Sequence, residues 1–246
     1  MITMLTSSTG FYKKDKDGKR TPDKFYWYNG FLDRLQKIWP LNAKVLIIAA
    51  SPENYAKNDD VCELYKQVLE MSNLSAVSVD ICDSRNVNII DKLNAIDVIF
   101  LSGGHVPTQN AFFKQLCLKE KLKSFTGIVV AWSAGSMNCA ETVYAGPELE
   151  GEALDPKYER WISGLGITKT NILPHFQSLR GECLDGMRLI EDITFADSVG
   201  REIIAMNDGT FILVEDGKET LFGEAYRIKD REMIQICQNG MSIALY

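Results

Sequence analysis

The sequence predicts an α/β fold in which a mostly parallel sheet carries helices on both faces and is followed by antiparallel strands near the C-terminus. Short, largely apolar runs at 45–50, 96–101 and 128–132 alternate with stretches in which apolar residues recur every three or four positions. Such runs are typical of strands buried on both faces, and the stretches between them are typical of helices. After position 200, turn sequences rich in Asp and Gly separate short strands, as in antiparallel hairpins.

The first half of the chain is expected to alternate helices with strands. The apolar face between Phe31 and Trp39 ends at Pro40, and Pro107 is well placed at the start of a later helix. This order implies right-handed crossovers and an open parallel sheet, whose first strand we expect at 45–50. The expected elements are helices at 31–39, 59–71, 86–93 and 107–118, and strands at 45–50, 76–82, 96–101 and 128–132.

The second half is expected to contain a loop region and then mostly strands. The acidic segment 141–158 is interrupted by glycines and prolines, which favours a loop. A short strand within 165–174 leads to His175, and 183–193 has the spacing of an amphipathic helix. Further strands are expected at 202–206, 211–215 and 233–237, with hairpin turns at 207–209, 215–217 and 229–231.

Length and charge limit the class of protein. At 246 residues and 46% hydrophobic content, the chain can form one large α/β domain, so we expect a single domain over 1–246. The net charge of −6 argues against nucleic acid or an anionic membrane surface as a partner. The basic residues at 13–20 are interleaved with Asp and Gly, and we interpret them as a solvated turn.

Cysteine and histidine usage points to a reduced compartment and to chemistry without a metal. Six scattered cysteines form no C-x-x-C pair, and only two histidines are present. We therefore expect free thiols, no zinc site and no other cofactor. No apolar run approaches the length of about 18 residues that a membrane span needs, and no signal peptide is evident. The expected location is the cytoplasm.

The segment 127–140 carries the strongest chemical signal. An apolar, β-branched strand leads into Ser133, which is followed at once by the small residues Ala134 and Gly135. A serine nucleophile on a sharp turn between strand and helix needs such small neighbours, because its backbone is held in a strained conformation. The alternative is an ordinary helix that Ser133 caps.

A serine hydroxyl needs a base within hydrogen-bond reach, and the chain offers His105 and His175. His175 is favoured because it follows Pro174 in a polar surround, whereas His105 lies on a glycine loop before a helix, where it would line a pocket or cap a turn. The amides of Ala134 and Gly104 are the natural oxyanion hole. A tight turn or a phosphate cradle is the alternative for the paired glycines.

Four motifs occur in order along the chain. They are Phe-Leu-Ser-Gly-Gly-His at 100–105, Ala-Trp-Ser-Ala-Gly-Ser-Met-Asn at 131–138, Leu-Gly-Ile at 165–167 and Leu-Pro-His-Phe at 173–176. Together they resemble peptidase family S51, the serine peptidases that include aspartyl dipeptidase (peptidase E) and cyanophycinase. The resemblance spans about 45–217 and implies a three-layer fold like that of class I glutamine amidotransferases, which is flavodoxin-like, with serine in place of their cysteine. It also implies Ser133 as the nucleophile, His175 as the general base, and Gly104 with Ala134 as the oxyanion hole.

The same resemblance implies an acidic third member of the triad in the loop after the nucleophile's helix. Glu148 lies at the matching distance from Ser133. Its close competitors are Glu141, Glu150 and Glu152.

The sequence departs from the family pattern at three places. His105 stands where the family usually has asparagine, so we expect it in the substrate pocket. The arginine thought to meet an acidic substrate side chain in aspartyl dipeptidase aligns near Leu184, and Arg180 or Arg188 is expected to serve instead. Residues 1–42 have no clear counterpart, and we treat them as an N-terminal extension that covers the sheet or mediates assembly.

The sequence thus predicts a cytoplasmic serine peptidase that hydrolyses small peptides, with dipeptides as the narrower expectation, acting as a monomer or homodimer. One alternative is an esterase of the α/β-hydrolase type, which is disfavoured because about seventy residues follow His175. The other is a non-catalytic binding domain on the same scaffold.

Overall fold

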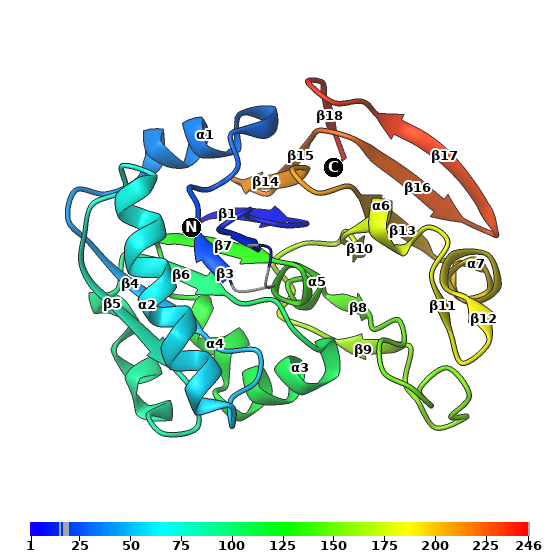
Figure 1. Cartoon of the computed structure of the whole chain (residues 1–246), viewed down its shortest axis with the longest axis horizontal. Coiled ribbons are helices and arrows are strands. Elements are labelled where there is room, and N and C mark those ends of the chain that lie inside the picture. The colour runs from blue at the N-terminus through cyan, green and yellow to red at the C-terminus, as the bar shows by residue number, and fades with distance from the viewer. Residues whose placement is uncertain (15, 17–19, 246) are drawn as a thin grey trace.

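A computed structural model describes residues 1–14, 16 and 20–245, and its centre is an eight-stranded sheet (Figure 1). Neighbouring strands follow the order β18-β15-β14-β1-β7-β6-β4-β5. The five strands from β1 to β5 in this order are parallel, and β14, β15 and β18 extend the sheet in antiparallel fashion. In chain order the strands are β1 (Ile2–Thr6), β4 (Ala43–Ile48), β5 (Ala76–Cys82), β6 (Val98–Leu101), β7 (Ile128–Trp132), β14 (Phe211–Glu215), β15 (Lys218–Phe222) and β18 (Ser242–Ala244).

Both faces of this sheet are buried, which gives the three layers expected from the sequence. Along β4, Val45 and Ile47 pack into a core cluster with residues of α1 and α2. Their neighbours Leu46 and Ile48 pack on the opposite face with residues of α3 and α4. Alternate side chains of a strand point to opposite faces, so a continuous apolar run is what a doubly covered strand requires. The helices are α1 (Phe31–Ile38), α2 (Tyr55–Met71), α3 (Val106–Gln115), α4 (Leu118–Leu122) and α5 (Ala134–Asn138), with 3₁₀ segments at Tyr28–Gly30 and Val87–Ala95.

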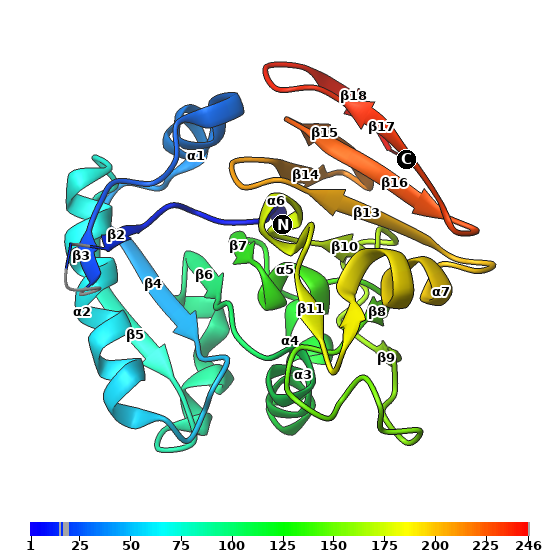
Figure 2. The same cartoon turned by 45° about the vertical axis from the view of Figure 1, so that its right-hand side comes forward.

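A second, four-stranded sheet lies beside the first and supplies further loops to the same region (Figure 2). Its order is β10-β13-β16-β17, and it packs against the first sheet's core through Ile172, Ile204 and Met206. Its strands are β10 (Ile172–Leu173), β13 (Glu202–Met206), β16 (Ala225–Lys229) and β17 (Glu232–Cys237). The remaining elements are the strand pairs β2 (Tyr12–Lys14) with β3 (Arg20–Pro22), β8 (Thr142–Tyr144) with β9 (Trp161–Ser163) and β11 (Cys183–Leu184) with β12 (Met187–Arg188), and the helices α6 (Phe176–Leu179), η3 (Leu189–Thr194, a π-helix) and α7 (Phe195–Asp197).

Two sequence-based expectations about the second half were wrong. The segment 183–193 is no amphipathic helix, because Asp185 and Gly186 both have positive φ (53° and 80°) and turn the chain between β11 and β12. The turn at 207–209 does not close a hairpin, since β13 and β14 belong to different sheets. The hairpin turns expected at 215–217 and 229–231 are present, between β14 and β15 and between β16 and β17.

The first strand of the sheet is β1, and not the strand expected at 45–50. It pairs in parallel with β7 and antiparallel with β14, so it lies near the middle of the sheet. Met4 and Leu5 are fully buried. The segment 1–42, whose role the sequence left open, therefore contributes a core strand. The end of this strand, at Thr6, lies beside Trp132 at the end of β7.

Two smaller expectations concern the surface and the thiols. The turn expected at 13–20 is flanked by the paired strands β2 and β3, and its residues 15 and 17–19 lie outside the described part. All six cysteines are free, and four of them are buried. Over the residues that the structure describes, none of the helices combines the length and the apolar character that crossing a membrane demands.

Candidate active site

Ser133 occupies a strained turn between β7 and α5. Its backbone angles, φ 52° and ψ −123°, lie in a region that L-residues rarely adopt. Its amide donates to the carbonyl of Thr6 (3.1 Å), which fixes the turn to β1. A Cβ at Gly135 would lie 2.3 Å from the carbonyl oxygen of Leu101, so this position must be glycine for the helix to start so close to β6. The Ser133 side chain makes no capping bond to the helix, which disfavours the alternative of an ordinary N-cap.

His175 follows β10 and is held by a carboxylate and by the N-terminal strand. Its Nδ1 lies 2.8 Å from Oδ1 of Asp208, on the segment between β13 and β14. The backbone amide of His175 donates to Oγ of Ser7 (2.7 Å), and Ser7 donates in turn to the same Asp208 oxygen (2.8 Å). The backbone amide of Asp208 donates to the side-chain oxygen of Gln177 (2.9 Å). Two segments that are distant from His175 in the sequence, at Ser7 and Asp208, thus hold this residue in place.

The surroundings of Asp208 keep it ionised. Partial burial would raise the pKa of this carboxyl group, but the hydrogen bond and charge of His175, together with the Ser7 hydroxyl, outweigh it and hold the pKa below its ordinary value. A carboxylate at Nδ1 requires the proton of a neutral imidazole to sit on that nitrogen, so Nε2 is left as the basic atom. This is the tautomer that a general base needs.

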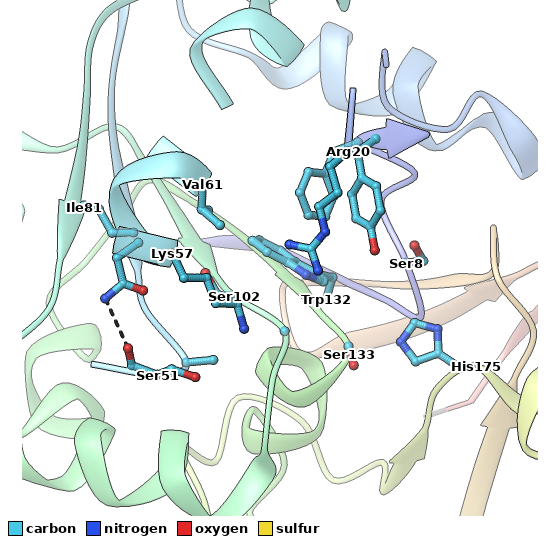
Figure 3. Close-up of a pocket in the computed structure, with 15 residues that line it drawn as sticks. Ser8, Arg20, Ser51, Lys57, Val61, Ile81, Ser102, Trp132, Ser133 and His175 are labelled. Atoms are coloured by element: carbon cyan, nitrogen blue, oxygen red, sulfur yellow. Dashed lines mark hydrogen bonds between the residues drawn. The ribbon is translucent and has the colours of Figure 1, made fainter. Parts of the chain in front are cut away.

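Ser133 and His175 line the same cavity of about 190 Å³, at the carboxyl edge of the parallel strands (Figure 3). Their side chains form no hydrogen bond with each other in the described part of the chain. Contacts between nucleophile and base are often long without substrate and tighten when it binds. The cavity opens where loops from β6, β7 and β10 meet, which is the usual ligand position in open α/β sheets.

Two backbone amides stand where an oxyanion hole was expected. Ala134 is the first residue of α5, so its amide lies in the first turn and has no acceptor within the helix. Gly104 lies in the loop after β6, where a Cβ would come within 2.7 Å of the Cβ of Ala50. The loop at Gly104 therefore passes so close to Ala50 that a residue with a side chain would not fit at this position.

The structure pairs His175 with Asp208, and not with the expected Glu148. One carboxylate oxygen of Glu148 instead faces the amide of Val106 at 3.4 Å. Although the residue is exposed, its carboxyl group lies against neighbouring protein, and this desolvation raises its pKa. None of the competing glutamates at 141, 150 and 152 bonds to His175 either. Sequence reasoning missed Asp208 because it interpreted 207–209 as a hairpin turn, for which Asp-Gly is ordinary.

His105 does not line the cavity. Its Nδ1 lies 2.7 Å from Oγ1 of Thr108, and its Nε2 lies 2.9 Å from Oε1 of Glu152. The other oxygen of Glu152 accepts from the amides of Glu148 and Leu149 (2.8 and 2.9 Å). His105 therefore ties the loop after β8 to the start of α3.

The two arginines expected to bind substrate also lie outside the cavity. Arg180 stacks on the ring of Phe176 at 5.5 Å, and Arg188 forms an ion pair with Asp192 at 2.6 Å. The basic side chains that do line the cavity are Arg20 of β3 and Lys57 of α2. Nothing in their sequence context marked them, because only the tertiary fold brings the N-terminal hairpin and α2 to Ser133.

A strained serine beside a histidine–carboxylate pair, at the carboxyl edge of a parallel sheet, defines an α/β serine hydrolase. Residues 25–222 match the model of peptidase family S51, and the chain belongs to that family. It is a serine peptidase. The strands and loop carrying Ser7 and Arg20 precede the matched span.

Comparison with solved structures supports the fold. A crystal structure described as a "Putative Peptidase E Protein" from Listeria monocytogenes EGD-e is similar over 96% of this chain and 97% of its own, with a TM-score of 0.53 and 14% identity. At this identity the likeness concerns the fold alone. A comparison with curated proteins found no significant match.

Proposed function

We propose that this serine peptidase hydrolyses short peptides through a triad of Ser133, His175 and Asp208. The observation that carries the proposal is the 2.8 Å contact between His175 Nδ1 and a carboxylate of lowered pKa, at the edge of the cavity that also holds Ser133. It supplies both the base and the group that orients the base, which a serine nucleophile requires.

The proposed reaction uses groups of the chain itself. Ser133 Oγ attacks the scissile carbonyl while Nε2 of His175 takes its proton, and Asp208 stabilises the imidazolium that forms. The amides of Ala134 and Gly104 receive the developing oxyanion. The imidazolium then protonates the leaving amine, and water, activated by the same histidine, releases the acid from the acyl-enzyme.

The preference for small substrates rests on the size of the cavity. At about 190 Å³ it is smaller than the pockets of roughly 300–1,000 Å³ that enclose drug-sized ligands. We propose dipeptides and other short peptides as substrates, a cytoplasmic location, and action as a monomer or homodimer without a nucleic-acid or membrane partner. The net charge of −6 supports the last point.

Labelling with a fluorophosphonate tests the nucleophile directly. The unmodified protein is expected to form a covalent adduct, and Ser133→Ala is expected to abolish it; equal labelling of both proteins would refute the proposal. A panel of dipeptides, N-blocked peptides and simple esters, with Ser133→Ala as the blank, then separates a dipeptidase from an endopeptidase and from an esterase.

A further inference from the structure

A chain of buried side-chain amides joins the two segments that carry the proposed oxyanion donors. Its members are Gln109, Asn110 and Asn138, which are all buried and lie outside the triad. Gln109 and Asn110 are on α3, which begins two residues after Gly104. Asn138 is the last residue of α5, which begins at Ala134. The amides therefore link the loop that carries one donor to the helix that carries the other.

This chain of amides has one direction and ends on the glycine loop. Asn110 Nδ2 donates to Oδ1 of Asn138 (2.9 Å), and Asn138 Nδ2 donates to Oε1 of Gln109 (3.1 Å). Gln109 Nε2 then donates to the backbone carbonyl of Ser102 (2.6 Å). A carbonyl can only accept, so a reversed Gln109 amide would place oxygen against oxygen. Successive hydrogen bonds of this kind polarise and strengthen one another.

Gln109 fixes the peptide group that precedes the donor at Gly104. The carbonyl of Ser102 and the amide of Gly103 belong to one planar peptide, and the Gly104 amide belongs to the next. Two successive glycines leave the direction of the Gly104 amide free unless neighbouring groups fix it. The amide of Ser102 donates to the carbonyl of Ile48 (3.1 Å), and Gln109 holds the carbonyl of the same residue. Ser102 is thus held on both sides immediately before the glycines.

Asn138 connects this arrangement to the helix that follows Ser133. Its Nδ2 also donates to the carbonyl of Val106 (3.1 Å), the first residue of α3. Val106 packs in one buried cluster with Ala134 and Met137 of α5, and the two helices are neighbours in the fold (Figure 1). A helix of five residues is too short to be stable by itself, so these contacts set where α5 lies relative to the glycine loop.

We infer that Gln109 is a positioning residue for the oxyanion hole. It holds the peptide after Ser102 and, through Asn138, the start of α5, so it sets the distance between the two donor amides. The inference rests on the proposed function, in which these amides receive the oxyanion. Gln109 does not line the cavity, and it acts through the backbone and not on the substrate. A misplaced donor stabilises the transition state less and leaves binding of the ground state intact.

Labelling with a fluorophosphonate measures this effect without a peptide substrate. In that reaction Ser133 Oγ bonds to phosphorus and passes its proton to His175, fluoride leaves, and the phosphonyl oxygen occupies the oxyanion hole. Gln109→Met removes both hydrogen bonds at nearly constant volume. Loss of one oxyanion donor costs about 100- to 1,000-fold in kcat, so a misplaced donor is expected to lower the maximal labelling rate about 10- to 100-fold. The probe concentration that gives half of this rate is expected to change by less than about 3-fold.

Asn110→Leu is the matched control within the same network. Asn110 is about as deeply buried as Gln109 (4% against 0% exposed), but its bonds go to Asn138 and to the carbonyl of Ser163 (3.0 Å), away from the glycine loop. Both variants are expected to lower the melting temperature, and only Gln109→Met is expected to slow labelling. Gln109→Asn is a second, milder variant that is expected to slow labelling too, because its shorter side chain cannot reach Ser102 and Asn138 together.

Three outcomes overturn the inference. Labelling of folded Gln109→Met at the unmodified rate shows that the glycine loop keeps its shape without this side chain. Equal slowing in Asn110→Leu assigns the effect to lost core packing, and a changed half-saturating concentration at an unchanged maximal rate assigns it to probe binding. If Gln109→Met does not fold, Gln109→Asn takes its place in each comparison. Absent labelling of the unmodified protein refutes the proposed function and the inference with it, whereas normal labelling that neither Gln109 variant slows refutes the positioning role alone.

Discussion

Asp208→Asn removes the charge at Nδ1 of His175 while keeping the shape of the side chain. The bond is 2.8 Å long, so charges centred about 4 Å apart would interact by about 4 kcal/mol at an effective dielectric constant of about 20. The two side chains are 36% and 30% exposed, which weakens this to about 3 kcal/mol, or roughly 100- to 1,000-fold in rate. We therefore expect kcat/KM and the rate of fluorophosphonate labelling to fall by that factor.

Glu148→Gln is the matched comparison, because Glu148 is the residue that the sequence alone places in the triad. Its carboxylate faces the amide of Val106 and not His175, so labelling of Ser133 should change by less than about 10-fold. The labelling rate is the decisive measurement, since the small probe needs the nucleophile and base but no peptide recognition. Labelling that collapses in Glu148→Gln and survives in Asp208→Asn would refute the assignment of Asp208, provided that both variants melt like the unmodified protein.

Three further predictions concern the elbow and its loops. Ser133→Gly removes the Cβ from a backbone at φ 52° and should melt about 2–4 °C above Ser133→Ala, for a gain of about 1 kcal/mol; a lower melting temperature would contradict stored strain. Gly135→Ala places a Cβ 2.3 Å from the Leu101 carbonyl and should cost about 2 kcal/mol or more and slow labelling, whereas unchanged melting would show that α5 can shift freely. Burial would raise the pKa of Glu152, but hydrogen bonds from two loop amides and the charge of His105 outweigh burial and lower the pKa. The ionised carboxylate therefore stabilises the loop fully at a pH above its ordinary pKa of 4.5. This stabilisation is lost as the pH falls through the lowered pKa of the folded state. Glu152→Gln should thus speed hydrogen exchange of 146–158 at neutral pH but not in acid, and equal exchange at neutral pH would count against the contact.

Local sequence patterns were sufficient to predict a helix or strand wherever its own residues show which of its faces are buried. The strand at 76–82 has the expected bounds, and α1 and β7 agree to within a residue. The serine elbow followed from β-branched residues running into small ones, because the strain at Ser133 needs small neighbours wherever the strand lies. His175 was favoured over His105 because it follows Pro174 in a polar surround.

The N-terminal strand shows what such patterns do not contain. The five residues at 2–6 are too few to predict a strand from their own pattern, yet β1 is buried between β7 and β14. Its end places Ser7 where the side chain accepts a hydrogen bond from the backbone amide of His175. Pairing across more than 120 residues, from Ile2 to Ile128, is a property of the folded chain and not of the segment.

By itself, the sequence determined the class of fold and the likeness to a peptidase family, and it predicted the serine elbow and the choice of histidine, because each depends on residues that are neighbours in the chain or on the order of strands. Only the tertiary structure decided which acid holds the histidine and which cations face the serine. Asp208 reaches His175 because β13 and β14 part into two sheets. Arg20 and Lys57 line the cavity although both precede Ser133 by more than seventy residues in the sequence. Contacts of this kind depend on which residues the fold brings close together in space. The sequence around a carboxylate or an arginine does not show which residue it will contact.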